Sequence, residues 1–408
     1  MGVITFMLKV FLINHNYEYQ VRELLKLFYN SKEIKIYNYD RVKDEEINDL
    51  NNDFIINQLS RVDNKVIVTT KGFIGGQVKE NTETLLIKRG HYNVNRSIKL
   101  IIKSSLYKIL TDFKKIKLPW GFLVGIRPSK IVHKMLDKGE TKEQIFNTLT
   151  DKYYLSKEKA SLLIDVAITE HKYIYPVDDK KISIYISIPF CPTRCSYCSF
   201  PSNILDDCKK YLDAYINALC NEIRKTSELI KDKQVESIYI GGGTPTTLNT
   251  NHFIKIFSCI KKYLNILGLR EFTVEAGRPD TINFKKLDLF KKNAVTRISI
   301  NPQTMNNCTL NKIGRKHTAE QIIEAYNLAK TIGFNNINMD VIIGLPGENT
   351  EMVRNTMECI KRMGPSNLTV HTLAIKTTSK LRDENYLIGD KNRYIVNMLD
   401  ITKEYAYE

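Results

Sequence analysis

The second part of the chain alternates short runs of β-branched and aromatic residues with amphipathic stretches. Six of these runs are predicted as strands, at 183–188, 237–240, 272–275, 297–300, 337–343 and 368–374. The intervening helices are predicted at 207–231, 252–267, 284–293, 319–332 and 351–363. Nearly continuous apolar runs are typical of strands that are covered on both faces. The pattern predicts an α/β fold, a barrel or partial barrel of six βα units with a parallel sheet and helices outside it.

The first part of the chain follows a different pattern. Strand-like runs at 33–39 and 65–70 accompany a helical stretch at 19–28, and residues 127–171 are predicted as three short helices. We expect an N-terminal α+β domain of unknown function with a helical connector, followed by a linker near 175–181. The expected division of the chain is an N-terminal part over 1–175, a βα core over 176–376 and the start of a C-terminal region over 377–408.

Composition narrows the class of protein. Of the 408 residues, 43% are hydrophobic and 26% are charged, and the mean hydropathy is -0.28. These values are typical of a globular protein with a full core, and no apolar window is long enough for a membrane span. The net charge of +16 is spread evenly on either side of residue 180, so a dedicated nucleic-acid surface is not expected. We expect a cytoplasmic protein that does not associate with membranes.

All eight cysteines follow residue 190, and three of them lie close together. Cys191, Cys195 and Cys198 occupy one loop directly after the predicted strand 183–188. Three thiolates on one loop can ligate three irons of a 4Fe-4S cluster and leave the fourth iron open. A zinc site is the alternative, but it needs a fourth ligand at regular spacing, and none follows. The other five cysteines are expected to be small, buried apolar residues.

A glycine-rich turn follows the next predicted strand. Gly241, Gly242 and Gly243 precede Thr244 immediately after the strand 237–240. Glycines let the backbone come close to a ligand and can present N–H groups to an anionic or zwitterionic group. The turn is therefore a candidate ligand-binding element beside the cysteine loop.

The cysteine loop CPTRCSYC and the turn GGGTPT resemble those of the radical S-adenosylmethionine (SAM) superfamily. The motifs over 183–376 resemble more narrowly the oxygen-independent coproporphyrinogen III oxidases and their relatives. The segment WGFLVGIRPSK at 120–130 resembles the N-terminal region of the HemZ-type coproporphyrinogen dehydrogenases. The resemblance implies a radical SAM partial (βα)6 barrel of the TIM type, with a 4Fe-4S cluster and one or two molecules of SAM as cofactors.

The resemblance also assigns residues to the site. Tyr185 and Tyr197 would be aromatic contacts near SAM, and Tyr185 is the predicted catalytic residue. The cluster ligands would be the three cysteines of the loop, and the further SAM contacts would be Gly242, Gly243, Thr244, Glu275, Gln303, Arg315, Asp340 and Ala374. Six of the predicted strands carry one of these residues near the carboxyl end, where the active site of a parallel βα barrel forms. The alternatives are a capping or loop acid for Glu275 and Asp340, a turn residue for Gln303 and a surface charge for Arg315.

The activity that the resemblance implies is an oxygen-independent oxidative decarboxylation in haem biosynthesis. A 5′-deoxyadenosyl radical from SAM would take a hydrogen atom from the β-carbon of a propionate, and loss of CO2 and one electron would leave a vinyl group. Two such reactions convert coproporphyrinogen III to protoporphyrinogen IX. The implied partners are this porphyrinogen and a reducing electron donor such as flavodoxin or ferredoxin, whereas the oligomeric state is not predicted.

Three features depart from the pattern of the oxidases. Ser187 stands where they have a histidine, and Phe200 stands where they have a fourth nearby cysteine. The chain ends at Glu408, whereas the family continues into a C-terminal domain that helps form the substrate side and a second SAM site. We therefore expect either that the chain is truncated or that this half of the site is absent.

Two other functions stay open. A haem chaperone of the same family is one, because its cysteine loop also ends in Cys-x-Phe, as Cys198, Ser199 and Phe200 do here. A radical SAM enzyme that modifies tRNA is the other, because the chain is basic and its N-terminal domain is unexplained.

Overall fold

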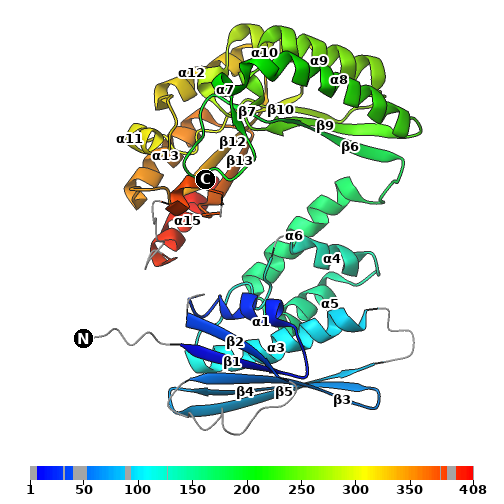
Figure 1. Cartoon of the computed structure of the whole chain (residues 1–408), viewed down its shortest axis with the longest axis vertical. Coiled ribbons are helices and arrows are strands. Elements are labelled where there is room, and N and C mark those ends of the chain that lie inside the picture. Colours follow the sequence, from blue (N-terminus) through cyan, green and yellow to red (C-terminus); the bar gives the residue numbers. More distant parts are fainter. Residues whose placement is uncertain are drawn as a thin grey trace. The chain divides into compact units, whose positions relative to one another are not determined.

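The computed structural model describes residues 7–30, 33–39, 53–87, 93–125, 127–376, 378–383 and 392–407. The chain forms two compact units, Met1–Val177 and Asp178–Glu408, coloured blue to cyan and green to red in Figure 1. Each unit has hydrophobic core clusters of its own.

The first unit contains a five-stranded mixed sheet with the strand order β2-β1-β3-β4-β5. Its strands are β1 (Leu8–Ile13), β2 (Ile34–Tyr39), β3 (Phe54–Val62), β4 (Lys65–Ile74) and β5 (Gln77–Leu86). β1 is parallel to β2 and β3, whereas β3, β4 and β5 form an antiparallel meander. Gly75 and Gly76 close the second hairpin with φ of 59° and 71°, values that a two-residue turn between twisted strands requires.

Two helices, α1 (Glu18–Leu25) and α3 (Val94–Lys114), complete this part of the fold. α3 packs on β4 and β5. Its fully buried side chains recur every four residues, at Ile98, Ile102, Leu106 and Leu110, so that one helix face covers the sheet. The expected N-terminal α+β architecture is confirmed.

A helical segment ends the first unit, with α4 (Ser129–Leu136), α5 (Lys142–Asn147) and α6 (Lys157–Ile174). Three helices are present as predicted, but α6 is a long helix of 18 residues. The Ser156 side chain caps it by accepting the Lys159 N–H. The buried stripe of α6 comprises Ala160, Leu163, Ile164 and Ala167.

The second unit contains a six-stranded sheet in which every strand is parallel to its neighbours, in the order β13-β12-β11-β10-β9-β6. The strands are β6 (Lys181–Ile188), β9 (Gln234–Gly242), β10 (Glu271–Glu275), β11 (Arg297–Ser299), β12 (Asn336–Ile343) and β13 (Asn367–Thr372). Each lies within a few residues of its predicted position. The predicted α/β partial barrel is confirmed.

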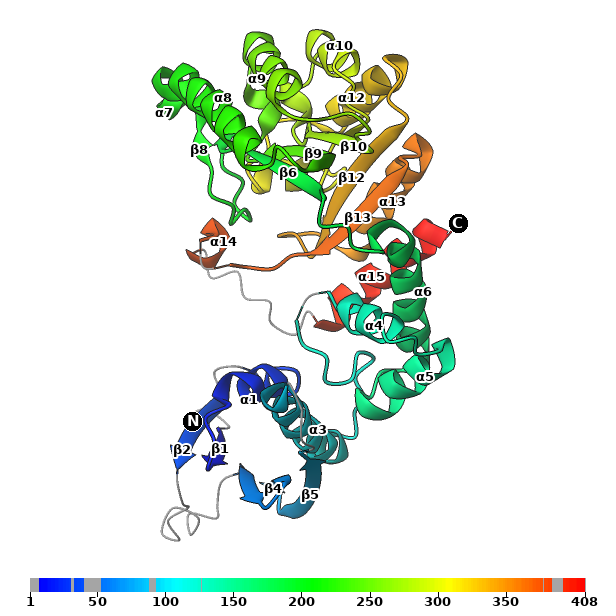
Figure 2. The same cartoon turned by 90° about the vertical axis from the view of Figure 1, so that its right-hand side faces the viewer.

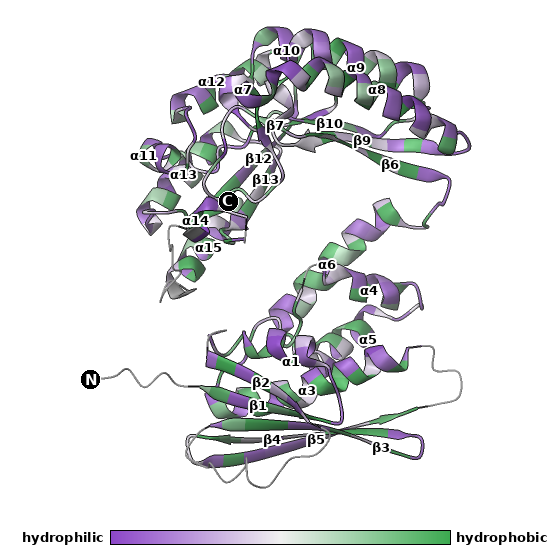
Figure 3. Ribbon diagram, viewed as in Figure 1, coloured by the Kyte–Doolittle hydropathy of each residue, from purple (hydrophilic) through white to green (hydrophobic). Residues whose placement is uncertain are grey.

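Helices follow the strands and lie along one side of the sheet (Figure 2). They are α8 (Leu212–Leu229), α9 (Thr250–Tyr263), α10 (Phe284–Lys292), α12 (Ala319–Thr331) and α13 (Thr350–Met363). Hydrophobic and hydrophilic residues alternate along them (Figure 3), as expected for helices with one face on a sheet. Four of them begin at an N-cap side chain that accepts a backbone N–H, at Asn249, Asn283, Thr318 and Asn349.

The predicted helix over 207–231 is wrong at its start. The segment divides into a short helix α7 (Leu205–Cys208), a 3-10 turn (Lys209–Tyr211) and α8. The residues of the turn are exposed, and the buried stripe that packs on the sheet begins only at Leu212. The amphipathic helix therefore begins where packing begins.

The described part of the C-terminal segment contains α14 (Lys380–Asp383) and α15 (Asn392–Tyr407). α15 packs on α13 through Met398 and Ile401, which share a cluster with Val353 and Met357. None of the helices in the described ranges is long and apolar enough to cross a membrane.

We predict that Phe253→Ala destabilises the second unit by about 3–5 kcal/mol, because the side chain is fully buried and its ring lies 4.6 Å from that of Phe290. Urea unfolding followed by circular dichroism measures this loss. The matched control is Phe284→Ala, since Phe284 is 58% exposed and its removal is expected to change stability by less than about 0.5 kcal/mol. Equal losses in the two variants would contradict the packing described here.

Candidate functional site

A cavity of about 440 Å³ lies at the carboxyl edge of the six-stranded sheet. This volume is within the range of roughly 300–1,000 Å³ that is common for small-molecule sites. All thirteen residues that the sequence nominated line it: Tyr185, Cys191, Cys195, Tyr197, Cys198, Gly242, Gly243, Thr244, Glu275, Gln303, Arg315, Asp340 and Ala374. The structure thus brings these side chains together, whereas their individual roles stay predictions.

The cysteine loop begins with the two-residue strand β7 (Phe190–Cys191), which pairs with β8 (Asn203–Ile204). Neighbouring loops fix its backbone: the Ser196 N–H donates to the Ile313 carbonyl at 3.0 Å, and the Thr193 hydroxyl donates to the Gly314 carbonyl at 3.1 Å. Burial raises the pKa of the Cys198 thiol, and the nearby Cys195 and Cys191 raise it further. Hydrogen bonds to neighbouring segments thus restrain the cysteine loop.

The three sulfurs do not converge on one point. Among the described residues, there is no group of three or more His, Cys, Asp or Glu side chains that could hold a single metal ion. A 4Fe-4S cluster takes each thiolate on a different iron, so it needs three separated sulfurs on one wall of a cavity. All three cysteines of the loop line the cavity, as such a cluster requires.

The glycine turn packs directly on the cysteine loop. A Cβ on Gly243 would lie 2.9 Å from the Cys191 Sγ and 2.6 Å from the Phe190 carbonyl oxygen. The N–H groups of Gly243 and Thr244 donate to the carbonyls of Ile188 and Phe190, at 2.9 Å and 2.8 Å. The expectation that these N–H groups face a ligand is therefore wrong for both residues. The glycine is needed for close packing, and the Thr244 hydroxyl reaches the Cys191 Sγ at 3.4 Å.

Glu275 ends β10 and points into the cavity beside two tyrosines. Its carboxylate accepts a hydrogen bond from the Tyr239 hydroxyl and one from the Gly242 N–H. Burial raises the pKa of Glu275, and the nearby Asp340 raises it further. The Tyr239 ring stacks on that of Tyr185 at 5.6 Å. Sequence reasoning missed Tyr239, although the two-residue period of β9 places it on the same sheet face as Gly241.

Gln303 is held against the strand β12 in a backbone conformation that few residues adopt. Its φ is +67°, its N–H donates to the Asp340 carbonyl and its own carbonyl accepts the Ile342 N–H, both at 2.9 Å. The side chain is 6% exposed, and its Oε1 has no hydrogen-bond partner among the described residues. A buried acceptor without a partner costs about 1–3 kcal/mol, so this atom is suited to a donor on a bound ligand.

Arg315 is buried, so its interpretation as a surface charge is wrong. Its guanidinium donates to the Asn301 carbonyl at 2.6 Å and to the Tyr197 hydroxyl at 3.2 Å. Burial raises the pKa of the Tyr197 hydroxyl, which therefore stays protonated beside Arg315. The pair forms part of the cavity wall next to the cysteines.

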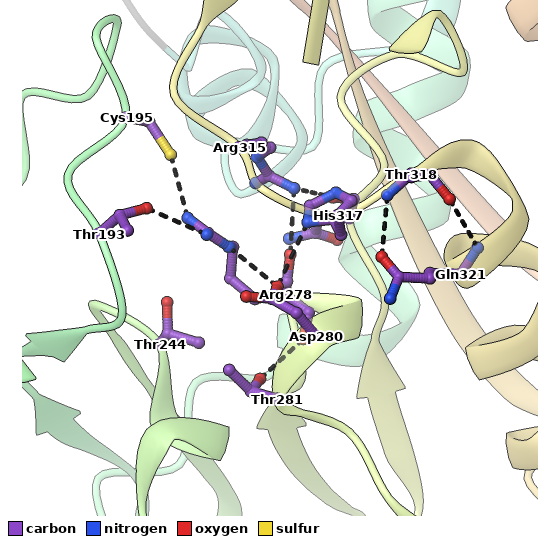
Figure 4. A network of polar contacts seen from close by, with 12 residues as sticks. Thr193, Cys195, Thr244, Arg278, Asp280, Thr281, Arg315, His317, Thr318 and Gln321 are labelled. Carbon is purple, nitrogen blue, oxygen red and sulfur yellow. Dashed lines mark hydrogen bonds and ion pairs between the residues drawn. The ribbon is translucent and has the colours of Figure 1, made fainter. Parts of the chain in front are cut away.

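A second buried arginine, Arg278, was missed by the sequence analysis. It follows the carboxyl end of β10 by three residues and donates to the Cys195 Sγ at 3.5 Å. Figure 4 shows its side chain pointing toward Cys195 and Thr193. The signal that could have found it is position, because the sequence analysis already placed the site at the carboxyl ends of the strands.

The comparisons with known proteins agree with this geometry. Residues 185–360 match the radical SAM superfamily, and the cysteine loop lies at the carboxyl edge of a parallel βα sheet. The fold and the site therefore define a radical SAM enzyme of the oxidoreductase type, whose cofactors are a 4Fe-4S cluster and SAM.

Comparison with individual proteins identifies one family within this superfamily. The oxygen-independent coproporphyrinogen-III oxidase-like protein HemZ of Bacillus subtilis is 36% identical over 87% of this chain and 73% of its own length, and the chain belongs to this family. The haem chaperone HemW of Lactococcus lactis is 34% identical over 48% of this chain and 50% of HemW. The structure of coproporphyrinogen III oxidase HemN from Escherichia coli is similar with a TM-score of 0.52 at 25% identity, over 59% of this chain and 55% of HemN. The chain thus spans about half the length of HemW and HemN.

The described residues fit the two cofactors. The three cysteines line one cavity, and the guanidiniums of Arg278 and Arg315 are buried beside them, where positive charge favours an anionic, thiolate-ligated cluster. The unpartnered Gln303 Oε1 provides an acceptor for a ligand with amino or hydroxyl groups.

We predict that Gly243→Ala loads less iron than the wild type, because its Cβ would displace the Cys191 loop. Iron and sulfide content after anaerobic reconstitution measures this effect. The control is Gly277→Ala in the same cavity, where the nearest atom would lie 3.4 Å from the new Cβ, and where iron content is expected to be retained. Full loading of Gly243→Ala would show that the close contact is not required.

Proposed function

We propose that this chain catalyses the oxygen-independent oxidative decarboxylation of porphyrinogen propionates to vinyl groups, with coproporphyrinogen III as the substrate and protoporphyrinogen IX as the product. One observation carries the proposal: every residue that the resemblance to the oxidases nominates lies around one cavity. The family membership through HemZ supports the same substrate class.

In each reaction the propionate loses a hydrogen atom from its β-carbon, CO2 and one electron, which passes to a one-electron acceptor. The reduced cluster together with SAM, when both are bound, would supply the radical that removes the hydrogen atom. The chain contributes binding and orientation. Tyr185, which we propose as the catalytic residue, is 60% exposed and lines the cavity beside Glu275, so it is placed to contact a substrate that enters there.

Two basic side chains at the cavity suit a substrate with several carboxylates. Arg194 and Lys376 both line it. The Arg194 guanidinium donates to the Thr378 carbonyl at 3.0 Å, and its buried Nε has no partner among the described residues. Charge-assisted hydrogen bonds from such groups would fix the propionates. We propose that these two residues bind substrate carboxylates.

The test is an anaerobic assay of the cluster-loaded full chain with SAM, a low-potential reductant and coproporphyrinogen III. We expect 5′-deoxyadenosine and protoporphyrin to appear together when the products are separated by chromatography. 5′-Deoxyadenosine without protoporphyrin would contradict the proposed substrate while leaving the radical SAM assignment intact.

We predict that Cys195→Ala loses the cluster and both products, since the cavity then keeps only two of its three ligands. Cys308→Ala is the matched control. Cys308 is exposed on the helix α11 (Asn307–Lys312), so the expectation that it is a buried apolar residue is wrong. The variant is expected to keep wild-type iron content and activity. Wild-type iron absorption in Cys195→Ala would overturn the ligand assignment.

A haem chaperone is the second candidate. Phe200 follows the last cysteine of the loop, is 68% exposed and lines the cavity, so it offers an apolar surface to a flat macrocycle. The haem chaperone HemW of Lactococcus lactis matches half of this chain. Stoichiometric haem binding that Phe200→Ala weakens, in a protein that forms no protoporphyrin, would favour this function over the oxidase.

A further inference from the structure

Arg278 contacts the cysteine loop with both ends of its guanidinium. Its Nη1 donates to the Cys195 Sγ at 3.5 Å, and its Nη2 donates to the Thr193 Oγ1 at 3.1 Å. The side chain is 4% exposed. An arginine that is buried against a predicted cluster ligand is not explained by solubility or by packing alone, because burying its charge is costly unless a partner compensates it.

Asp280 and His317 fix the orientation of this guanidinium. The Arg278 Nε donates to the Asp280 Oδ1 at 3.3 Å, and the same oxygen lies 3.2 Å from the His317 Nδ1. Although burial alone would raise it, these two neighbours hold the pKa of Asp280 well below its usual range, so the carboxylate is charged. Figure 4 shows this series of contacts from Cys195 through Arg278 to Asp280 and His317.

Other contacts restrain the members of this network. His317 is completely buried in its side chain and directly precedes the N-cap Thr318 of α12. Asp280 lies in a 3-10 turn (Pro279–Thr281) whose Thr281 hydroxyl donates to the Arg278 carbonyl at 2.7 Å. The guanidinium therefore cannot rotate freely, and its donor stays directed at the sulfur.

A donor and a positive charge at a ligand sulfur have a known electrostatic consequence. A 4Fe-4S cluster on three thiolates is anionic, and its negative charge increases on reduction. Hydrogen bonds to the sulfurs and nearby positive charge stabilise the reduced form more than the oxidised form, which raises the reduction potential. The effect requires a fixed donor, and the Asp280 pair provides one.

We propose that Arg278 is a positioning residue that raises the reduction potential of the cluster by donating a hydrogen bond to the Cys195 sulfur, with Asp280 and His317 holding its guanidinium in place. The role makes reduction by a cellular electron donor easier. It depends on the cluster assignment and not on the porphyrinogen substrate, so it holds for either proposed function.

The test is a redox titration of the cluster-loaded full chain in the absence of substrate. The electron paramagnetic resonance signal of the reduced cluster reports the fraction of cluster that is reduced at each potential. In Arg278→Gln we expect the ratio of reduced to oxidised cluster at a fixed solution potential to fall about tenfold, which is about 59 mV for a one-electron couple. Arg278→Lys keeps the charge but loses the planar fork, so we expect a smaller shift in the same direction.

Lys292→Met is the control, because Lys292 is an exposed cation at the end of α10 whose ammonium pairs with Asp288. We expect its cluster to keep a potential close to that of the wild type.

Wild-type potentials in both Arg278 variants, at full iron content, would overturn the proposal. If Arg278→Gln does not retain iron, the lysine variant decides: a lowered potential supports the proposal and an unchanged one contradicts it. Loss of protoporphyrin formation alone would leave this result unaffected.

Discussion

The site depends on the contact between the glycine turn after β9 and the cysteine loop after β6. At Gly243 the two backbones approach so closely that a single Cβ would lie 2.9 Å from the Cys191 sulfur. This approach is possible because β6 and β9 are parallel neighbours in the sheet, so that their carboxyl ends share one edge. The same edge receives Glu275, Gln303 and the remaining cavity residues from the strands that follow. The parallel sheet thus brings motifs that are distant in the sequence together along one side of the cavity.

Several of the charged side chains that line the cavity are buried. Two guanidiniums, those of Arg278 and Arg315, are almost fully enclosed beside the cysteines, and the carboxylate that pairs with the first is Asp280. Glu275 and Asp340 also line the cavity, and burial raises the pKa of Glu275. The cavity lining therefore contains both guanidinium and carboxyl groups, a combination suited to a zwitterionic cofactor.

Much of the fold of the second unit and many of the cavity residues were predicted from the sequence. The six βα repeats were predicted because apolar strands and amphipathic helices have different periods. The site residues were assigned by the resemblance to the oxidases, and their places near strand ends agreed with that assignment. Other features needed three-dimensional information. Arg278 and Tyr239 occupy ordinary sequence contexts, and only packing shows that one reaches Cys195 and the other Glu275. The start of α8 was misplaced because Lys209–Tyr211 has helical composition, whereas contact with the sheet decides where the long helix begins.

The central claim is that the nominated residues form one SAM-binding cavity, and the equilibrium affinity of the cluster-loaded chain for SAM tests it most directly. Gln303→Met removes the unpartnered buried acceptor while nearly preserving volume. Because a lost buried hydrogen bond costs about 1–3 kcal/mol, we predict that the dissociation constant for SAM rises about ten- to a hundredfold while iron content stays unchanged. An unchanged dissociation constant at full iron content would contradict the account.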